Sequence, residues 1–297
     1  RRRIFGMLQL SIPLGYLLGL ILALELSPLY GWRIIYIFTG SIGLILALVI
    51  LIGVKDVPRG LSEPELSLTD QLQNSRLELP EIMRLFKIRS LRFLFMQGLI
   101  GVIPWQVITF WSFRYLEVER NYGPNTVSSI MIPAVLMIGA GYFFGGFIGD
   151  AAYKRTIYGR IIVSIISIFF GAIFLAITIN LPYEKVTAFR ILLAITSFFI
   201  PLASPNIATS VYDIVLPEMR STATSIQYFL GNIGSAFAPL LAGAIGQAYS
   251  LQTALLLISL SAWIITAIIL SFSLKNFKND WESMRLELKE RNQPSSI

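Results

Sequence analysis

The sequence contains no cysteine and no histidine. Their absence excludes disulfide bonds, thiolate or imidazole metal sites, and nucleophile systems built on Cys/His or Ser/His pairs. The 17 carboxylates lie almost all between the apolar runs, and none lies at the centre of such a run. An intramembrane hydrolase needs a pair of membrane-buried carboxylates, which these runs cannot assemble. We therefore expect a protein that is not an enzyme and that holds no metal or other cofactor.

Charged residues are also scarce. They make up 14% of the chain while hydrophobic residues make up 55%, whereas soluble domains carry about a quarter charged residues. A bilayer core about 30 Å thick needs roughly 20 apolar residues per helix, and helices satisfy their own backbone hydrogen bonds in hydrocarbon. The sequence therefore predicts an all-α integral membrane protein with eight transmembrane helices. The apolar runs are 4–24, 34–54, 93–116, 126–148, 161–180, 190–213, 222–246 and 252–274.

The net charge of +7 is distributed unevenly between the two ends of these predicted helices. Of the 24 lysines and arginines, 19 fall on the side that holds both termini and 5 on the other side. The positive-inside rule then places both termini of this chain in the cytoplasm of a multi-pass protein. We expect it in the plasma (inner) membrane, with the lipid bilayer rather than nucleic acid as the partner of its positive charge.

Two polar segments interrupt an otherwise apolar chain. Residues 55–92 hold six acidic and seven basic residues, and the end of this segment, 80–89, predicts a short basic amphipathic helix on the inner leaflet. In the second segment, 275–297, Asn279 followed by Glu282 fits a capping box and predicts a solvated helix over 280–291. The first segment divides the predicted spans into two and six.

Three short motifs stand out at the connections between the predicted spans. They are Gly146-Phe147-Ile148-Gly149-Asp150 followed by Lys154, Arg155, Gly159 and Arg160; Gly31-Trp32-Arg33; and Pro217-Glu218-Met219-Arg220. All three resemble motifs of the major facilitator superfamily. The first resembles that family's cytoplasmic loop motif, the second the start of its sixth helix, and the third the start of its eleventh.

The resemblance implies that the chain is a fragment covering helices five to twelve of a twelve-helix, two-bundle fold, without helices one to four. Residues 1–54 would be the last two helices of the N-terminal bundle, and 55–92 the central cytoplasmic loop with its amphipathic helix. Residues 93–274 would be the C-terminal six-helix bundle, and 275–297 a cytoplasmic tail. Within the family, three segments resemble the Spinster-like branch of lipid and drug exporters, which implies efflux: Ile12-Pro13-Leu14-Gly15, Pro58-Arg59-Gly60 and Ile103-Pro104-Trp105.

The loop motif predicts a cytoplasmic latch that opens and closes as two bundles rock. A carboxylate at a helix end can accept hydrogen bonds from a neighbouring helix N-terminus, and the nearby cations can pair with it or with lipid phosphates. The alternative is that the cations only satisfy the positive-inside rule, which does not explain the single acid. The residues of the predicted latch are Gly146, Asp150, Lys154, Arg155, Gly159, Arg160 and Arg220.

The resemblance implies that the third and sixth spans face a central cavity. Along the third span, polar and small residues recur at helical spacing, as they do along the sixth, and prolines at 104, 201 and 205 are expected to interrupt both spans. The alternative is that these polar side chains hold helices together by hydrogen bonds. The residues predicted to line the cavity are Gln97, Trp105, Gln106, Thr109, Asn206 and Ser210.

These observations predict a secondary active transporter that moves a small organic solute by alternating access. The apolar, aromatic lining favours an amphipathic or hydrophobic solute over a sugar or an inorganic anion. A coupling ion such as a proton stays open, with Asp213 as a weak local candidate for its carrier. The alternative from another class is a transporter-like membrane sensor or scaffold without transport.

Overall fold

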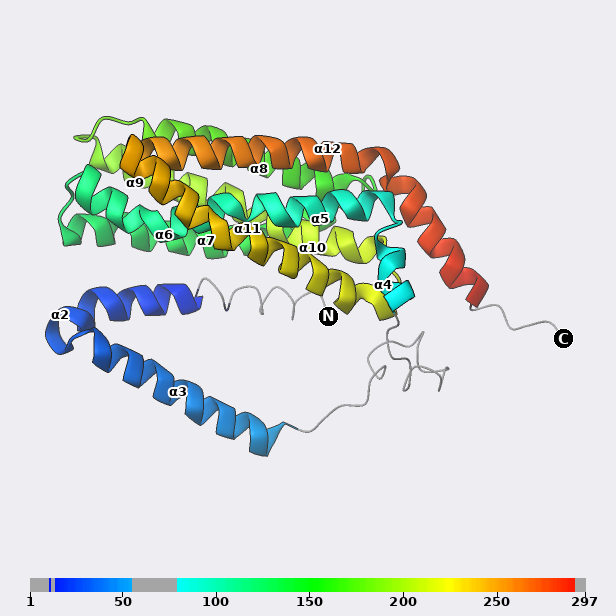
Figure 1. Cartoon of the computed structure of the whole chain (residues 1–297), viewed down its shortest axis with the longest axis horizontal. Coiled ribbons are helices and arrows are strands. Elements are labelled where there is room, and N and C mark those ends of the chain that lie inside the picture. Colours follow the sequence, from blue (N-terminus) through cyan, green and yellow to red (C-terminus); the bar gives the residue numbers. More distant parts are fainter. Residues whose placement is uncertain (1–10, 12–13, 55–78, 292–297) are drawn as a thin grey trace. The chain divides into compact units, whose positions relative to one another are not determined.

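The computed structural model describes residue 11 and residues 14–54 and 79–291 of the 297-residue chain. Every regular element among them is a helix, which confirms the all-α prediction for this part of the chain. Seven of the helices are long and apolar enough to cross a membrane (Figure 1). The first expected span, 4–24, falls for the most part outside the described residues, although residues 14–21 are helical.

The described residues divide into two compact units, of which the smaller spans Leu18–Met83. In it a π-helical turn, η1 (Leu22–Leu26), leads into α2 (Ser27–Tyr30) and α3 (Trp32–Gly53). Gly31 joins α2 to α3 with a φ of 78°, which glycine adopts without steric cost. No residue of α3 is buried against the rest of the described chain. A helix that is apolar all round requires lipid or other helices around it.

The larger unit contains the chain from Arg84 onward. Its helices lie side by side (Figure 1): α12 packs on α5, α6 and α8, α7 packs on α9, and α11 packs on α5. After α4 (Leu79–Leu85), the elements are α5 (Arg89–Gly101), α6 (Ile103–Arg114), η3 (Tyr115–Glu119), α7 (Pro124–Tyr153), α8 (Gly159–Ile179), α9 (Val186–Phe199), η4 (Ile200–Leu202), α10 (Ala203–Asp213), η5 (Pro217–Met219), α11 (Arg220–Ala248) and α12 (Leu251–Arg291).

Proline interrupts two of the spans, as the sequence predicts. The third span breaks at Val102 into α5 and α6, with Pro104 in the first turn of α6. The sixth span passes through the 3₁₀ turn η4, which contains Pro201, between α9 and α10. Proline has no backbone N–H and its ring displaces the carbonyl four residues earlier, so the helix cannot run on unchanged. Pro205 lies in the first turn of α10, where an N–H needs no intrahelical partner, and it does not break that helix.

The two short helices predicted outside the spans are present in altered form. The helix predicted over 80–89 ends at Leu85, and Arg89 already begins α5. Residues 280–291 are helical, but no helix begins at Asn279, so the capping-box prediction is wrong. They continue α12, whose 41 residues extend about 60 Å, twice the hydrocarbon thickness. Within this continuation Phe277 is fully buried, so the start of the added stretch packs against the rest of the unit.

A stripe of glycines lets α7 approach the sixth span to backbone contact. Gly141, Gly145 and Gly149 recur every four residues and so lie on one face of α7. A Cβ on Gly145 would lie 2.7 Å from the Leu202 carbonyl oxygen, and those on Gly141 and Gly149 would collide with Phe198 and Asn206. Small residues permit such close packing between membrane helices. Gly146, one position further round α7, has open space where its Cβ would lie.

The stripe generates a stability prediction with a control on the same helix. Gly145→Ala should lower the free energy of unfolding by about 1–3 kcal/mol, because the added methyl group forces α7 away from Leu202. Gly146→Ala should be neutral or stabilising by up to about 1 kcal/mol, because its methyl group meets no atom of the described chain. Unfolding of the purified protein in detergent measures both. Equal destabilisation by the two variants would contradict the assigned packing face.

Candidate functional site

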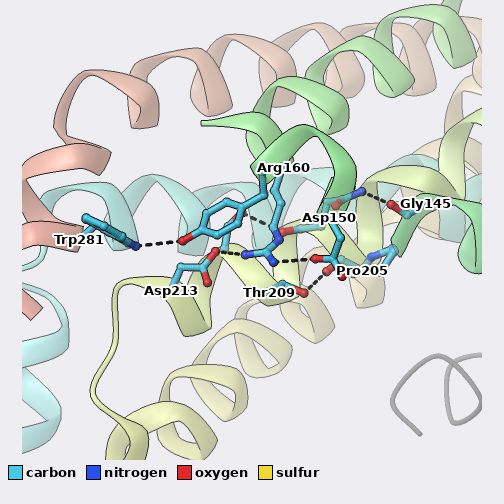
Figure 2. Close-up of polar contacts among 10 residues, drawn as sticks. Gly145, Asp150, Arg160, Pro205, Thr209, Asp213 and Trp281 are labelled. Carbon is cyan, nitrogen blue, oxygen red and sulfur yellow. Dashed lines mark hydrogen bonds and ion pairs between the residues drawn. The ribbon is translucent and has the colours of Figure 1, made fainter. Parts of the chain in front are cut away.

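Arg160 joins three helices at one end of the larger unit. From the first turn of α8 its Nη2 donates to Asp150 Oδ1, near the end of α7, at 2.6 Å. Its Nη1 donates to Asp213 Oδ2 on the last residue of α10. The Arg160 side chain is only 3% exposed, while the carboxylates of Asp150 and Asp213 are 34% and 18% exposed. These three residues, called the ion cluster below, are drawn in Figure 2.

The loop sequence brings Arg160 back to Asp150 within ten residues. Successive turns close the loop, with the Lys154 N–H donating to the Asp150 carbonyl and the Gly159 N–H donating to that of Thr156. A Cβ on Gly159 would collide with the backbone of α7 at Ala152. Because glycine has no Cβ, α8 can begin in contact with the last turn of α7. The loop-motif glycine therefore sets the distance that the ion cluster requires.

An aromatic pair covers the remaining face of the Arg160 guanidinium. The ring of Tyr153 lies with its centroid 3.9 Å from the guanidinium carbon. Trp281, on α12, donates from its indole Nε1 to the Tyr153 hydroxyl at 3.1 Å (Figure 2). The Arg160 guanidinium thus lies over an aromatic ring while two of its N–H donors bind carboxylates. A planar guanidinium can satisfy both kinds of contact at once.

The structure gathers only part of the predicted latch. It brings Asp150, Gly159 and Arg160 together and adds Asp213, which the sequence had marked only as a weak proton-carrier candidate. Lys154 and Arg155 lie exposed in the loop outside the ion cluster. Arg220 begins α11, with its guanidinium carbon 6.0 Å from the centroid of the Tyr212 ring, beside Asp213 in sequence.

A small cavity of about 60 Å³ lies within the larger unit. Trp105 and Thr109 of α6 line it, as the sequence predicts, and the Thr109 hydroxyl donates to the Trp105 carbonyl at 2.7 Å. Both interrupted spans contribute to its wall. The other lining residues include Ser112, Met131, Ala134, Val135, Ile138, Leu175, Leu193, Thr196, Ser197, Ile200, Pro201 and Trp263.

The other predicted cavity residues lie outside this cavity. Asn206 is buried and donates from Nδ2 to the carbonyls of Gly145 and Leu202, at 2.8 and 2.7 Å. Ser210 is buried and donates to the Asn206 carbonyl. These are the interhelical and intrahelical bonds of the packing alternative, because the face of α10 that carries both residues points into the unit.

Two glutamines of the predicted cavity also lie elsewhere. Gln97 Oε1 accepts a hydrogen bond from Gln227 Nε2 of α11 at 3.5 Å. Gln106 is half-buried on α6 and does not line the cavity. The break at Val102 separates Gln97 from Trp105, which uninterrupted helical spacing had placed on one face.

A second buried arginine, at the opposite end of α8, was not identified from the sequence. Arg120 is 3% exposed and donates from Nη2 to the carbonyls of Ile179 and Leu181, at 3.2 and 2.7 Å. Ile179 ends α8, where the helix dipole is negative and favours a cation. The Nε of Arg120 donates to the Tyr115 hydroxyl at 2.9 Å, and the guanidinium carbon of Arg120 lies 4.2 Å from the centroid of the Phe189 ring.

Glu119, next to Arg120, makes the complementary contact. Its carboxylate accepts the backbone N–H groups of Leu251 and Gln252, the latter at 2.9 Å, at the positive N-terminus of α12. In the sequence, the only sign of these contacts was that two opposite charges, Glu119 and Arg120, are adjacent. Their partners are backbone groups of distant helices, which residue spacing does not reveal.

Comparisons with known proteins give one consistent match. Residues 1–181 match the family model described as Major Facilitator Superfamily. The chain is 23% identical over 290 residues to the cis,cis-muconate transport protein of Acinetobacter baylyi, an alignment that covers 94% of this chain and 66% of that protein. The chain thus spans about two thirds of the length of that relative.

Among solved structures, the chain resembles a bacterial homologue of the human lysosomal transporter Spinster, crystallised in an inward-facing, unoccupied conformation. The TM-score is 0.54 at 18% sequence identity, and the match covers 99% of this chain and 67% of the other. This likeness shows a shared fold.

The ion cluster generates a second stability prediction. Arg160→Leu should lower the free energy of unfolding by about 3–5 kcal/mol, because two partly buried carboxylates lose their shared cation. Arg155→Leu, in the exposed part of the same loop, should stay within about 0.5 kcal/mol of the parent protein. Denaturant unfolding in detergent compares them. Similar values for both variants would show that the ion cluster does not hold α7, α8 and α10 together.

Proposed function

Because this chain belongs to the major facilitator superfamily of membrane transporters, we propose that it is part of a secondary active transporter that carries a small organic solute by alternating access. We assign residues 1–54 to the last two helices of an N-terminal bundle, 55–92 to the central loop, 93–274 to a C-terminal six-helix bundle and 275–297 to a tail. Eight of twelve helices would be two thirds of such a protein. This fraction agrees with the share of the muconate transport protein that the alignment covers, which is 66%.

The observation that carries this proposal is the wall of the cavity. Both proline-interrupted spans, α5–α6 and α9–η4–α10, contribute side chains to it. Interrupted membrane helices are tolerated where they line a cavity, and transporters place substrate sites at such breaks. A volume of about 60 Å³ holds only a few water molecules. A solute therefore enters when the helices around the cavity move apart, as alternating access requires.

The cavity wall favours a solute with a substantial apolar part. Its side chains are aliphatic, aromatic or hydroxyl-bearing, with Trp105 and Trp263 as the largest. The relative from Acinetobacter baylyi is named for transport of cis,cis-muconate, an unsaturated dicarboxylate. Small unsaturated organic acids are therefore the first substrates to test, and neutral amphipathic compounds are the second.

The ion cluster is the candidate latch of this cycle. Its three members come from α7, α8 and α10, and α10 belongs to the same span as the cavity residues of α9 and η4. Movement of the sixth span therefore strains or releases the Arg160 contacts. If a proton couples to transport, the partly exposed carboxylate of Asp213 within the ion cluster is the local candidate to carry it.

The test measures solute flux and binding separately in proteoliposomes that contain the full-length protein. With radiolabelled muconate as the first probe, we expect saturable flux. Asp150→Asn should lower turnover by about five- to thirtyfold, because the loss of about 1–2 kcal/mol from a charge-assisted contact shifts the conformational populations by that factor. Affinity measured with the conformation fixed should stay nearly constant.

Glu282→Gln is the control, because Glu282 is exposed on α12 and pairs only loosely with Lys278, at 3.8 Å. Unchanged turnover in Asp150→Asn would show that the loop is not a latch and that its cations only help to set the membrane topology. Absence of flux for muconate, other organic acids and neutral amphipathic solutes would favour a membrane sensor or scaffold.

Topology can be tested with single cysteines, because the chain has none of its own. Arg155 and Lys185 are exposed near opposite ends of α8. The charge distribution predicts that an impermeant maleimide labels a cysteine at Lys185 from outside the cell. The same reagent should label one at Arg155 only after the membrane is permeabilised. Labelling of both from the same side would contradict the proposed orientation.

A further inference from the structure

The stretch of α12 from residue 275 to 291, called the α12 extension below, carries charged residues at short intervals beyond the apolar run. It nevertheless packs against the end of the unit that holds the ion cluster. Phe277 is fully buried, with its ring centroid 6.5 Å from that of Tyr158. Asp280 Oδ2 accepts the Ser90 N–H, in the first turn of α5, at 2.8 Å. The extension therefore has a defined position, anchored on α5 and on the loop before α8.

From this position the α12 extension reaches the ion cluster through two aromatic side chains. Trp281, one residue after Asp280, donates to the Tyr153 hydroxyl at 3.1 Å. The Tyr153 ring in turn lies 3.9 Å from the Arg160 guanidinium carbon. These contacts link Trp281 through Tyr153 to Arg160 and the two carboxylates, and Figure 2 labels Trp281, Arg160, Asp150 and Asp213.

The orientation of the Tyr153 ring affects the geometry of the ion cluster. Arg160 bonds to Asp150 and Asp213 through Nη2 and Nη1, which lie in the plane of the guanidinium. The guanidinium carbon lies over the Tyr153 ring, 3.9 Å from its centroid, where cation–π attraction is favourable. Rotation of the ring would leave the plane free to tilt away from one of the carboxylates. The hydrogen bond from Trp281 opposes this rotation, because it fixes the far end of the ring.

We propose that Tyr153 and Trp281 are positioning residues that hold Arg160 in the ion cluster, so that the α12 extension controls how readily the latch opens. This inference rests on the latch function proposed for the ion cluster. Displacement of the extension from α5 and α7 would withdraw the indole donor, loosen the ring and weaken the contact of Arg160 with Asp150 or Asp213. The conformational equilibrium of the transporter is then coupled to the docking of its last helix.

The experiment follows the accessibility of one cysteine placed at Thr109, on the cavity wall, in the full-length protein. A small charged methanethiosulfonate reagent added on one side modifies this cysteine at a rate that reports the open population. Trp281→Phe should change the rate by about two- to tenfold, in the same direction as Asp150→Asn, because one hydrogen bond is lost. Tyr153→Phe, which keeps the ring and removes the acceptor, should give the same change.

The double variant of Trp281→Phe and Tyr153→Phe should change the rate no more than either single variant, because both delete the same bond. In a background of Asp150→Asn and Asp213→Asn, Trp281→Phe should have no effect, because Arg160 has then lost both carboxylate partners. Glu282→Gln, an exposed change on the same extension, should leave the rate unchanged.

Each other outcome overturns the inference in a recognisable way. If Asp150→Asn changes the rate and the aromatic variants do not, the latch stands and the positioning role is wrong. If Trp281→Phe keeps its effect in the background without the carboxylates, it acts by another route. A lower melting temperature without a change in rate would show a structural role alone. If Asp150→Asn has no effect either, the latch proposal fails together with the inference.

Discussion

Backbone contact between α7 and the sixth span is the constraint on which the rest of the larger unit depends. Helices in lipid gain little from the hydrophobic effect between them, so close packing and interhelical hydrogen bonds hold them together. The glycines at 141, 145 and 149 remove the side chains that would keep these helices apart. Asn206 then reaches across to the Gly145 carbonyl, and Asp150, one residue past the stripe, lies within reach of Arg160 together with Asp213.

The unit buries one arginine near each end of α8, and the two are stabilised differently. Arg120 binds the carbonyls at the C-terminus of α8, and those oxygens cannot leave it unless the backbone moves. Arg160 binds two carboxylate side chains, which can rotate about their own bonds. Glu119 adds to the fixed end, since it accepts backbone N–H groups of α12. The end with Arg160 is therefore the one suited to a reversible contact.

The proposed cycle follows from this asymmetry. The sixth span contributes η4 to the cavity wall and ends at Asp213 in the ion cluster, so events at the cavity and at the cluster act on one segment of chain. The 3₁₀ turn at Pro201 is part of the cavity wall, and α10 connects it to Asp213. The α12 extension adds a third contact to the same cluster through Trp281 and Tyr153. In the proposed cycle, solute binding, latch opening and docking of the α12 extension are therefore linked.

Hydropathy, proline positions and the loop motif were enough to predict the helical class, the spans that the structure describes and the breaks near 104 and 201. They also indicated that cations of the loop could pair with Asp150, and Arg160 is the one that does. These properties are local: about 20 apolar residues make a span, a proline removes a backbone hydrogen bond from the helix around it, and a ten-residue loop limits how far apart its ends can lie. The family followed from the same motifs and agrees with the match over residues 1–181.

Helical spacing also showed which residues share a face, but it could not show which way that face points. Asn206, Ser210 and Asp213 do share a face of α10, yet that face meets α7 and α8 instead of the cavity. Gln97 and Trp105 were placed on one face only on the assumption of an unbroken helix, and the break at Val102 separates them. The sequence alone determined the spans that the structure describes and the family of the chain. The rotation of each helix, and with it the partners of Asn206, Arg120 and Trp281, was decided by tertiary packing, because it depends on side chains distant in the sequence.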